Sequence, residues 1–390
     1  MMKELFNNEA FHRAIKKFSQ SFYANTLEDS DDNYISSPLG AWVLLAVLAG
    51  YTDFRDADDD KENVKDALGM EIPDALQVAE SLLSGDDVDV SVQVWSDSRF
   101  ANEAPRIKSW LESSPHGSGD IPSQEELNEW VQSKTNGLIK EFPIDVNGKL
   151  FFLLAATVIY TKFSWEVPYK VVDFDSDWGT DRVLFDEKAH VSFYKDNENY
   201  IVAYSKSDAE LHSVCNVMSL TPDVPILKVL EYAHELCTRY GDGVLKRVSY
   251  AEVFAAGIDS NILEMTEVPD SVNDSSDVHL PAWEAKSDLN LNDPALGFYG
   301  IADVLSKDVE PGAYDGFECK QSAFAKYDTK GFEAAAVTAF SMMRASAIMR
   351  RGTNYHASVK FVKPYASLCH KRFTPLFAAV VNKAMEPSEE

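Results

Sequence analysis

Residues 331–343 read Gly-Phe-Glu-Ala-Ala-Ala-Val-Thr-Ala-Phe-Ser-Met-Met. The even-numbered positions from Phe332 to Met342 would share one face of a strand, and they hold only apolar or small residues. The other face runs from Gly331 to Met343 and contains the one charged residue, Glu333. This period of two predicts a strand with one core face, and its small central residues would fit between existing strands with little steric conflict.

The residues that follow this stretch are polar and basic. They include Arg344, Arg350 and Arg351 and end at Asn354, a composition typical of an exposed loop. The sequence therefore predicts an insertable strand that leads into an exposed, cleavable loop. A helix followed by a linker is the alternative for the same residues, because alanine is also the best helix former.

Length and charge limit the classes of protein. A chain of 390 residues suggests two or three domains at about 150 residues each, although single domains of this length also exist. The hydrophobic content of 45% is enough for a sizeable core. The net charge of −27 repels phosphate backbones and anionic lipid, so we expect neither nucleic-acid binding nor electrostatic docking to a membrane.

Cysteines, histidines and the N-terminal residues give no pattern of a disulfide framework, a metal site or a leader. The 4 cysteines are scattered without a CxxC pair, and the 8 histidines complete no ligand set. No apolar run of signal-peptide type opens the sequence, and the longest apolar stretches, 41–50 and 150–160, are about half the ~20 residues that span a bilayer. We therefore expect a soluble, cytoplasmic protein without a metal or cofactor.

Helical patterns dominate the first part of the chain and strand patterns the rest. Helices are predicted around Phe6–Phe22, from Ser37 through Leu48, and over Ser123–Phe142, which opens with a capping-box pattern. Strands are predicted over 149–160, 214–220, 278–283, 318–343, 358–361 and 377–381. This order favours an α+β fold with a mostly antiparallel sheet over βαβ repeats.

The sequence contains none of the short motifs that mark common enzymes. GxSxG, GxxxxGK[ST] and HExxH are absent, and no GxGxxG lies between a predicted strand and a helix. Serine, histidine and aspartate could still be brought together by the fold, although no spacing indicates such a triad. We therefore expect no catalytic residues and no enzymatic activity.

Six short segments resemble motifs of one protein family and occur in that family's order. They are Asn33–Leu39 (N-x-[FIV]-x-S-P), Leu127–Ile139 (the helix over the main sheet), Ile159–Tyr169 (YFKGxWxxPF), Leu280–Gly297 (LPxF…LG), Gly331–Ala336 (GTEAAA) and Lys363–Tyr365 (RPF). Each motif is weak alone, whereas six in the right order are strong. The chain thus resembles the serpins over nearly its whole length, as an intracellular, prokaryote-like member.

The resemblance implies one serpin domain over residues 1–390, with three mostly antiparallel β-sheets, eight or nine helices and an exposed reactive-centre loop at about 329–356. It also implies suicide inhibition of serine proteases. The protease cleaves the loop, forms an acyl-enzyme with the residue before the scissile bond, and is dragged along as the hinge inserts into the main sheet. The implied hinge consists of Gly331, Phe332, Glu333, Ala334, Ala335, Ala336, Val337 and Thr338.

The register of the family places the scissile bond about fourteen residues beyond Gly331, between Ala345 and Ser346. Alanine before that bond suits elastase-like or subtilisin-like proteases. Cleavage one residue earlier, after Arg344, would suit trypsin-like proteases instead. The bonds after Arg350 and Arg351 are expected to be nicking sites without inhibition, because the inserted strand would be too long.

Several positions depart from the family pattern. Phe332 stands where the hinge usually has Thr or Ser, and this bulk is expected to slow the first step of insertion. Phe163 replaces a glycine before the breach tryptophan, Trp165. In the shutter Ser37 is kept, Gly40 replaces a serine, Thr157 replaces an asparagine and Gln321 replaces a histidine. A hydrogen bond between Thr157 and Gln321 across the sheet opening is the expected substitute.

Three functions remain open at this point. The first is a monomeric inhibitory serpin whose partner is a serine protease. The second is a non-inhibitory serpin that binds, stores or chaperones and is cleaved as a simple substrate; the bulk of Phe332 and the altered shutter favour it. The third is an unrelated soluble enzyme or scaffold. An inhibitor predicts covalent complexes and a large gain in heat stability after cleavage.

Overall fold

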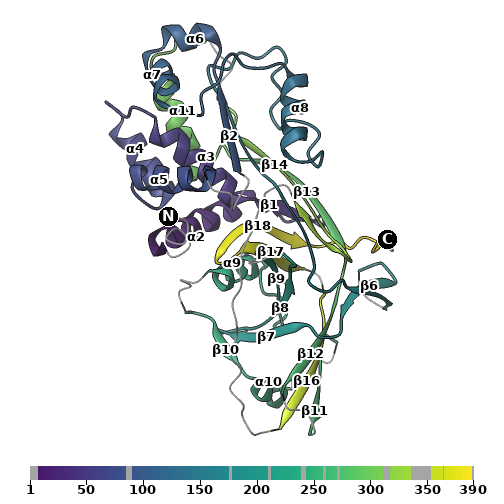
Figure 1. Ribbon diagram of the computed structural model, residues 1–390. Coiled ribbons are helices and arrows are strands. Elements are labelled where there is room, and N and C mark those ends of the chain that lie inside the picture. The colour runs from purple at the N-terminus through teal and green to yellow at the C-terminus, as the bar shows by residue number, and fades with distance from the viewer. Residues whose placement is uncertain are drawn as a thin grey trace.

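The computed structural model describes residues 8–84, 90–174, 178–209, 212–238, 243–257, 261–269, 273–310, 312, 317–334, 353–362 and 364–388. Helices gather at one end of an elongated molecule and sheets make up the rest (Figure 1). The expected α+β class and mostly antiparallel pairing are confirmed. The described residues form ten α-helices, one or two more than the resemblance implies.

The N-terminal helices build the helical end of the core. They are α2 (Glu9–Thr26), α3 (Pro38–Gly50), α4 (Asp58–Leu68) and α5 (Ile72–Leu83). Helix α3 is buried at every residue except Gly50, because its sequence is apolar on all sides. The side chain of Ser37 caps this helix by accepting a hydrogen bond from the Gly40 amide.

The remaining helices are shorter, and α8 is shorter than its sequence pattern predicts. They are α6 (Ser98–Glu103), α7 (Pro105–Ser113), α8 (Gln124–Lys134), α9 (Ile226–Cys237), α10 (Tyr250–Ala256) and α11 (Phe298–Ser306), with a 3₁₀ turn at Pro294–Leu296. Helix α8 begins at the predicted capping box of Ser123 and Glu126. It ends well before Phe142, because Asn136 and Gly137 take positive φ angles of 51° and 79°.

A seven-stranded sheet lies at the centre of the molecule. Its strands, in spatial order, are β1 (Tyr34–Ser36), β18 (Thr374–Val381), β17 (Tyr365–Lys371), β9 (His212–Ser219), β8 (Asn199–Lys206), β7 (His190–Lys195) and β10 (Lys246–Val248). Every residue of β17 and β18 is buried, so these strands are covered on both faces. This sheet supports the main sheet and α3 from below.

A five-stranded sheet extends away from the helical end (Figure 1). Its spatial order is β11 (Leu263–Val268), β16 (Asn354–Lys360), β12 (Ser275–Leu280), β6 (Arg182–Asp186) and β5 (Lys170–Asp173). Strand β16 is parallel to β12, and all other pairs are antiparallel. Strand β12 ends two residues before β13 of the main sheet begins.

The strands of the main sheet form two separate hydrogen-bonded sheets. One sheet has the order β13 (Trp283–Asn290), β14 (Lys320–Tyr327), β15 (Gly331–Ala334) and β4 (Thr161–Ser164). The other pairs β2 (Val90–Trp95) with β3 (Leu154–Ile159). The described residues therefore form four sheets where three were expected. The reason is that β14 and β3 do not pair with each other beyond the end of β15.

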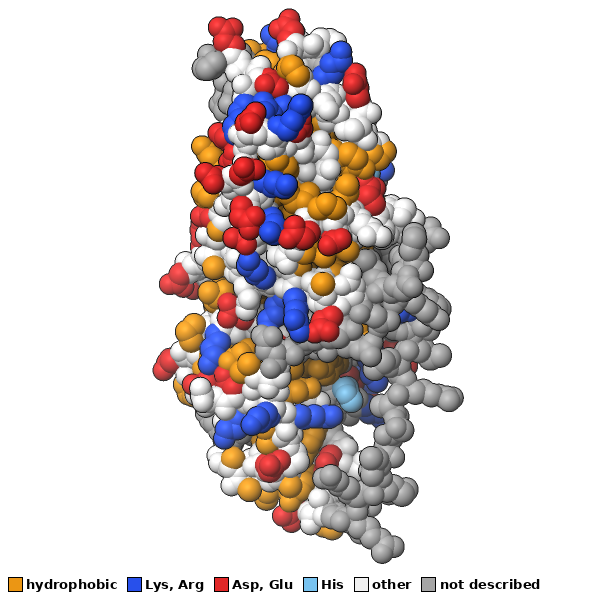
Figure 2. All heavy atoms as spheres, turned by 90° about the vertical axis from the view of Figure 1, so that its left-hand side faces the viewer, with side chains coloured by type: hydrophobic (Ala, Val, Ile, Leu, Met, Phe, Trp, Pro, Cys, Tyr) orange, Lys and Arg blue, Asp and Glu red, His pale blue; other side chains and the backbone are white. Residues whose placement is uncertain are grey.

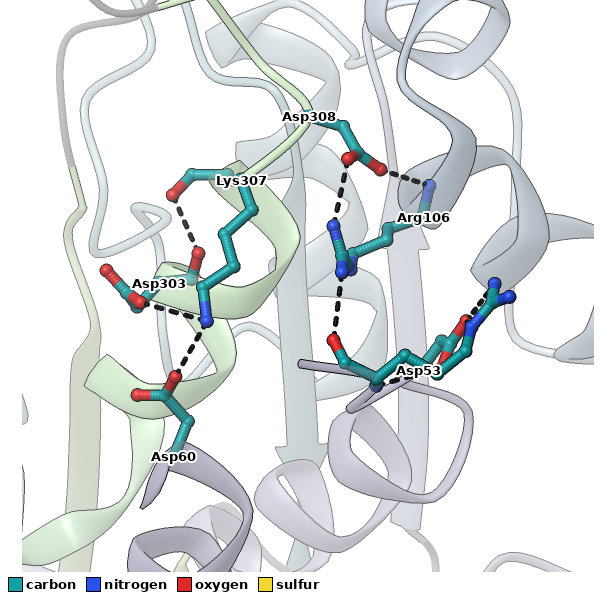
Figure 3. Close-up of polar contacts among 8 residues, drawn as sticks. Asp53, Asp60, Arg106, Asp303, Lys307 and Asp308 are labelled. Atoms are coloured by element: carbon teal, nitrogen blue, oxygen red, sulfur yellow. Dashed lines mark hydrogen bonds and ion pairs between the residues drawn. The ribbon is translucent and has the colours of Figure 1, made fainter. Parts of the chain in front are cut away.

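Helix α11 is fixed beside this divided sheet by a group of ion pairs (Figure 3). The ammonium of Lys307 lies 3.1 Å from Asp60 and 3.7 Å from Asp303. The guanidinium of Arg106 donates to Asp308 at 2.9 Å, and a second nitrogen of Arg106 donates to the carbonyl of Arg55. These contacts tie the end of α11 to α4 and to the start of α7.

The surface carries both signs of charge despite the net charge of −27. Figure 2 shows Lys and Arg side chains interspersed with Asp and Glu over the face it presents, with hydrophobic side chains between them. No helix among the described residues is long and apolar enough to cross a bilayer. The described residues also hold no group of three or more His, Cys, Asp or Glu placed to bind a metal ion.

Candidate functional site

The candidate site is the space between β14 on one side and β4 with β3 on the other, which we call the sheet opening. Strand β15 fills one end of it. Ala334 is paired with Ala325 of β14 and with Thr161 of β4, and Phe332 is paired with Tyr327 and with Phe163. The first four residues of the predicted hinge therefore already form a strand between two others.

Gly331 occupies a position that no side chain could share. A Cβ atom built on Gly331 would lie 2.2 Å from the carbonyl oxygen of Phe163, well inside van der Waals contact. The glycine thus allows β15 to begin directly against the β4 backbone. Burial then alternates along β15: Phe332 and Ala334 are buried, whereas Gly331 and Glu333 are partly exposed.

Phe332 lies in an aromatic cluster. Its side chain is 2% exposed, its ring stacks on Phe163 at 5.6 Å between centroids, and its edge meets Trp283 at 6.2 Å. In this arrangement the bulk of Phe332 packs against the bulk of Phe163, so the two departures from the family pattern compensate each other in space. The expected slowing of insertion stays a prediction.

Glu333 faces the opposite side of β15 and is held by two neighbours. Its carboxylate accepts a hydrogen bond of 2.9 Å from the Tyr160 hydroxyl and forms an ion pair of 3.1 Å with Lys162. Burial, together with this carboxylate, raises the pKa of Tyr160. The only charge of the predicted strand is therefore accommodated on the exposed face of the sheet.

Trp165 closes the end of the sheet opening. Its indole N–H donates to the Asp328 carbonyl at 2.7 Å, and its backbone amide donates to Lys330 at 2.9 Å. The Asp328 carboxylate accepts from the amide of Thr329 and from the hydroxyl of Ser388. These contacts fix the turn that precedes Gly331, and hydrogen bonding with Ser388 lowers the pKa of Asp328 against the opposing effect of burial.

Beneath this end lies a buried hydroxyl network. The hydroxyls of Tyr169, Tyr327 and Ser205 lie within 2.7 Å of one another, and each can serve as donor to the next. Burial raises the pKa of Tyr169 to about 12, so its phenol stays protonated. Asn216 of β9 donates to Ser205 of β8 within the central sheet, and the contact of Ser205 with Tyr327 of β14 joins this sheet to the main sheet.

His212 packs on the other face of Phe163. The imidazole and phenyl rings are stacked with centroids 5.2 Å apart. Burial, with the neighbouring charge of Lys371, lowers the pKa of His212 to about 3. A neutral imidazole therefore supports the ring pair that receives Phe332.

The other end of the sheet opening is a cavity. It has a volume of about 140 Å³ and is mostly apolar. Strand β3 and the start of β14 form its two sides, α3 and α11 line it from within, and α8 covers it. Thr157 of β3 and Gln321 of β14 both line this cavity, each on one of its two sides.

The shutter residues contact one another differently from the expectation. The Gln321 side chain makes two hydrogen bonds with the Ser37 backbone, accepting from its amide at 2.8 Å and donating to its carbonyl at 2.9 Å. The Ser37 hydroxyl donates to Leu376. The predicted Thr157–Gln321 bond is wrong, because both groups of the Gln321 amide are engaged by Ser37. The buried hydroxyl of Thr157 has no partner among the described residues.

The remaining predicted site residues lie outside the described residues. They are the rest of the hinge (Ala335, Ala336, Val337 and Thr338), the expected scissile bond (Ala345–Ser346), the alternative Arg344, and Arg350 and Arg351. Their assignments stay predictions.

No protein-family model and no curated protein matches the sequence. Among solved structures, a thermophilic serpin, tengpin, in its latent state is 16% identical, with 97% of this chain and 99% of that chain covered at a TM-score of 0.65. A serpin from the trematode Schistosoma haematobium is 17% identical, with 96% and 100% covered at a TM-score of 0.62.

This chain has the serpin fold. The native state of tengpin also matches, at 17% identity and a TM-score of 0.60, with 98% of this chain and 94% of that chain covered. Strand β15 holds the first residues of the predicted hinge, Trp165 is the predicted breach residue, and the predicted shutter residues Ser37 and Gln321 contact each other.

Sequence reasoning missed two features of the site. One is the ring pair of Phe163 and Phe332, although both positions had been noted as bulky replacements. Their occurrence in one chain was the available signal, because two large residues at paired positions can pack together. The other is the network of Tyr169, Tyr327 and Ser205, which joins three distant segments and has no local sequence pattern.

Proposed function

We propose that this serpin-fold protein inhibits serine proteases by a suicide-substrate mechanism. In this proposal the residues beyond Ala334 lie in an exposed loop that a protease cleaves. The cleaved strand then continues β15 into the cavity end of the sheet opening, while the protease remains attached through the acyl bond. The observation that supports it most is β15 itself, because its described residues already pair with β14 on one side and with β4 on the other.

The observed register predicts where the following residues would go. Because β15 is antiparallel to both neighbours, its continuation would place Ala336 opposite Ile159 and Ala323, and Val337 opposite Val158. Small or apolar residues would thus meet small or apolar partners. The alternation seen in Phe332 and Ala334 would continue with the same face toward the core.

The same register gives the polar residue of the strand a polar position. Thr338 would lie opposite Thr157 on one side and Gln321 on the other. A threonine hydroxyl can donate and accept, so Thr338 could satisfy the buried Thr157 hydroxyl that has no partner among the described residues. The polar group on the inner face of the strand therefore matches the one hydroxyl without a partner among the described residues of the cavity wall.

Filling the cavity end supplies the driving force. Each new ladder hydrogen bond contributes roughly 0.5–1.5 kcal/mol, and about a dozen would form along both edges of the inserted strand. The uncleaved chain would be less stable than the cleaved one and held by a kinetic barrier. The acyl-enzyme would form with Ala345, so the expected targets are elastase-like or subtilisin-like proteases, or trypsin-like ones if Arg344 is used.

Denaturing gels and peptide sequencing test this proposal. The protein is incubated separately with elastase, subtilisin, chymotrypsin and trypsin, and the released C-terminal peptide is sequenced. We expect an SDS-stable complex and a peptide that begins at Ser346, whereas a start at Ala345 would assign cleavage to Arg344. Cleavage without a complex by any of the four would favour the non-inhibitory alternative, in which the protein binds or stores other molecules.

A further inference from the structure

Strand β16, which follows the loop, has a neighbour on each side. Strand β12 pairs with it in parallel from Ser275 to His279, and β11 pairs with it in antiparallel from Leu263 to Val268. The edge of this sheet is therefore β11, and β16 is an interior strand. We propose that β11 is a lock that keeps β16 in its sheet and so prevents the uncleaved chain from inserting its own loop. This inference rests on the proposed function.

The connection between β15 and β16 is too short for full insertion without cleavage. It contains 19 residues, 335–353, which span at most about 65 Å when fully extended. Each residue that enters the sheet opening uses about 3.4 Å of this length and moves the attachment point about 3.3 Å further away. Seating residues 335–341 would take the inserted strand as far as Leu154, at the start of β3. The chain that remains could then reach only about 20 Å back beyond Ala334.

The path that must be bridged is longer than that remainder. Strand β16 is parallel to β12, and β12 runs toward the main sheet, so Asn354 lies at the end of β16 that is remote from the sheet opening (Figure 1). Returning from Ala334 requires about 10 Å along β15, which has four residues, and about 20 Å along β16, which has seven. Full insertion of an uncleaved loop thus requires β16 to leave its sheet, whereas a cleaved loop has no such constraint.

Contacts on both sides hold β16 in place. Toward β12, the His356 imidazole lies 2.9 Å from the Asp277 carboxylate and 2.9 Å from the Ser275 hydroxyl. Ser358 donates a hydrogen bond of 2.7 Å to the same carboxylate. Toward α10, the Tyr355 ring packs on Phe254 with centroids 5.0 Å apart.

The β11 ladder adds a second set of backbone bonds to these. The amide of Lys360 donates to the carbonyl of Ile262 at 2.9 Å, so these two residues form a hydrogen-bonded pair of the ladder. Because bonded and non-bonded pairs alternate in an antiparallel ladder, the amide of Thr266 faces β16 and the amide of Glu267 faces solvent. Both side chains are exposed, so these two neighbours offer a matched pair of proline substitutions.

The test compares Thr266→Pro with Glu267→Pro in the full, uncleaved chain. Samples are held below the melting temperature, and the fraction that resists urea unfolding on a gel is followed with time, with mass spectrometry confirming intact chains. The same samples are assayed for loss of complex formation with subtilisin. We expect Thr266→Pro to convert about tenfold faster than Glu267→Pro, because only the former removes a ladder bond to β16.

A second variant keeps the test decisive if Thr266→Pro is poorly folded. Glu267→Cys with Tyr355→Cys places two cysteines at a non-bonded pair, the geometry in which antiparallel Cα atoms are closest. We expect the oxidised form to become resistant to urea more slowly than the reduced form. Once the loop is cleaved, the oxidised form should gain as much stability as the wild type gains on cleavage. Equal rates for the two prolines, or no effect of oxidation, would overturn the lock even if cleavage stabilises every form. A wild-type chain that gains no stability on cleavage would instead contradict the proposed function.

Discussion

The two ends of the sheet opening share their flanking strands but differ in what lies between them. At the Trp165 end, β15 is paired on both sides and its inner side chains lie in an aromatic cluster. At the α8 end, the same strands enclose a cavity of about 140 Å³ and a hydroxyl, that of Thr157, without a partner among the described residues. The filled end thus displays the pairing that the open end could adopt.

The comparison separates two roles of the hinge sequence. Gly331 and Phe332 set the register, because one permits close backbone approach and the other is enclosed by rings. The alanines beyond Ala334 require little space and would follow that register. Changes at the filled end should therefore alter the stability of the uncleaved chain, and changes beyond it should alter only what cleavage adds.

The largest expected effect follows from placing a charge on the core-facing side of the inserted strand. Such a change should abolish the stability that the chain gains when its loop is cleaved. In Ala336→Arg the guanidinium would have to enter the core beside Ile159 and Ala323, so insertion should stop there. Melting before and after cleavage should show that the gain, on the order of 10 kcal/mol, is mostly lost. Ala335→Arg is the control, because in the proposed register position 335 would face the side of the sheet on which Glu333 is partly exposed. Equal losses in both variants would contradict the assigned faces.

Phe332→Ala should destabilise the uncleaved chain by roughly 3–4 kcal/mol, because it removes a buried ring from the aromatic cluster. Urea unfolding measures this free energy. A double-mutant cycle with Phe163→Ala should give a coupling energy on the order of 1 kcal/mol, since the two rings stack. Strict additivity would refute the claim that these two residues compensate each other.

Acidification should weaken the Trp165 end. His212 has a pKa of about 3 in the folded chain and about 6.5 when unfolded, so the unfolded chain binds more protons below pH 6.5. Its contribution is complete above pH 6.5 and declines as the pH falls toward 3, by about 2 kcal/mol at pH 5. Urea unfolding of His212→Phe between pH 7 and pH 5 should show a correspondingly smaller loss than the wild type. Parallel pH dependences would contradict this assignment.

The smallest expected effect is at Thr157. Thr157→Val removes the buried hydroxyl that has no partner among the described residues and keeps the shape, so the uncleaved chain should be unchanged or more stable by up to about 1 kcal/mol. The gain on cleavage should fall by a similar amount, because Thr338 would lose its partner. Differential scanning calorimetry of both forms can resolve this difference. A Thr338→Val variant that behaves differently would argue against the predicted register.

Much of the fold could be predicted from sequence because its signals are local. The apolar run of α3 and the capping box of α8 each describe their own helix. The end of α8 was missed, since a favourable pattern continues beyond the turn at Gly137. The division of the main sheet could not be predicted, because it depends on which distant strands pair. For the same reason Gln321 was assigned the wrong partner: Ser37 lies 284 residues away in the chain.

The central claim is that the open end of the sheet opening is filled after cleavage. Thermal unfolding of the chain before and after one cut in residues 335–352 tests it most directly. We expect the cleaved chain to melt higher, by on the order of 10 °C or more, because the inserted strand adds a ladder on both edges. An unchanged or lower melting temperature would show that the open end stays empty, and would contradict the account.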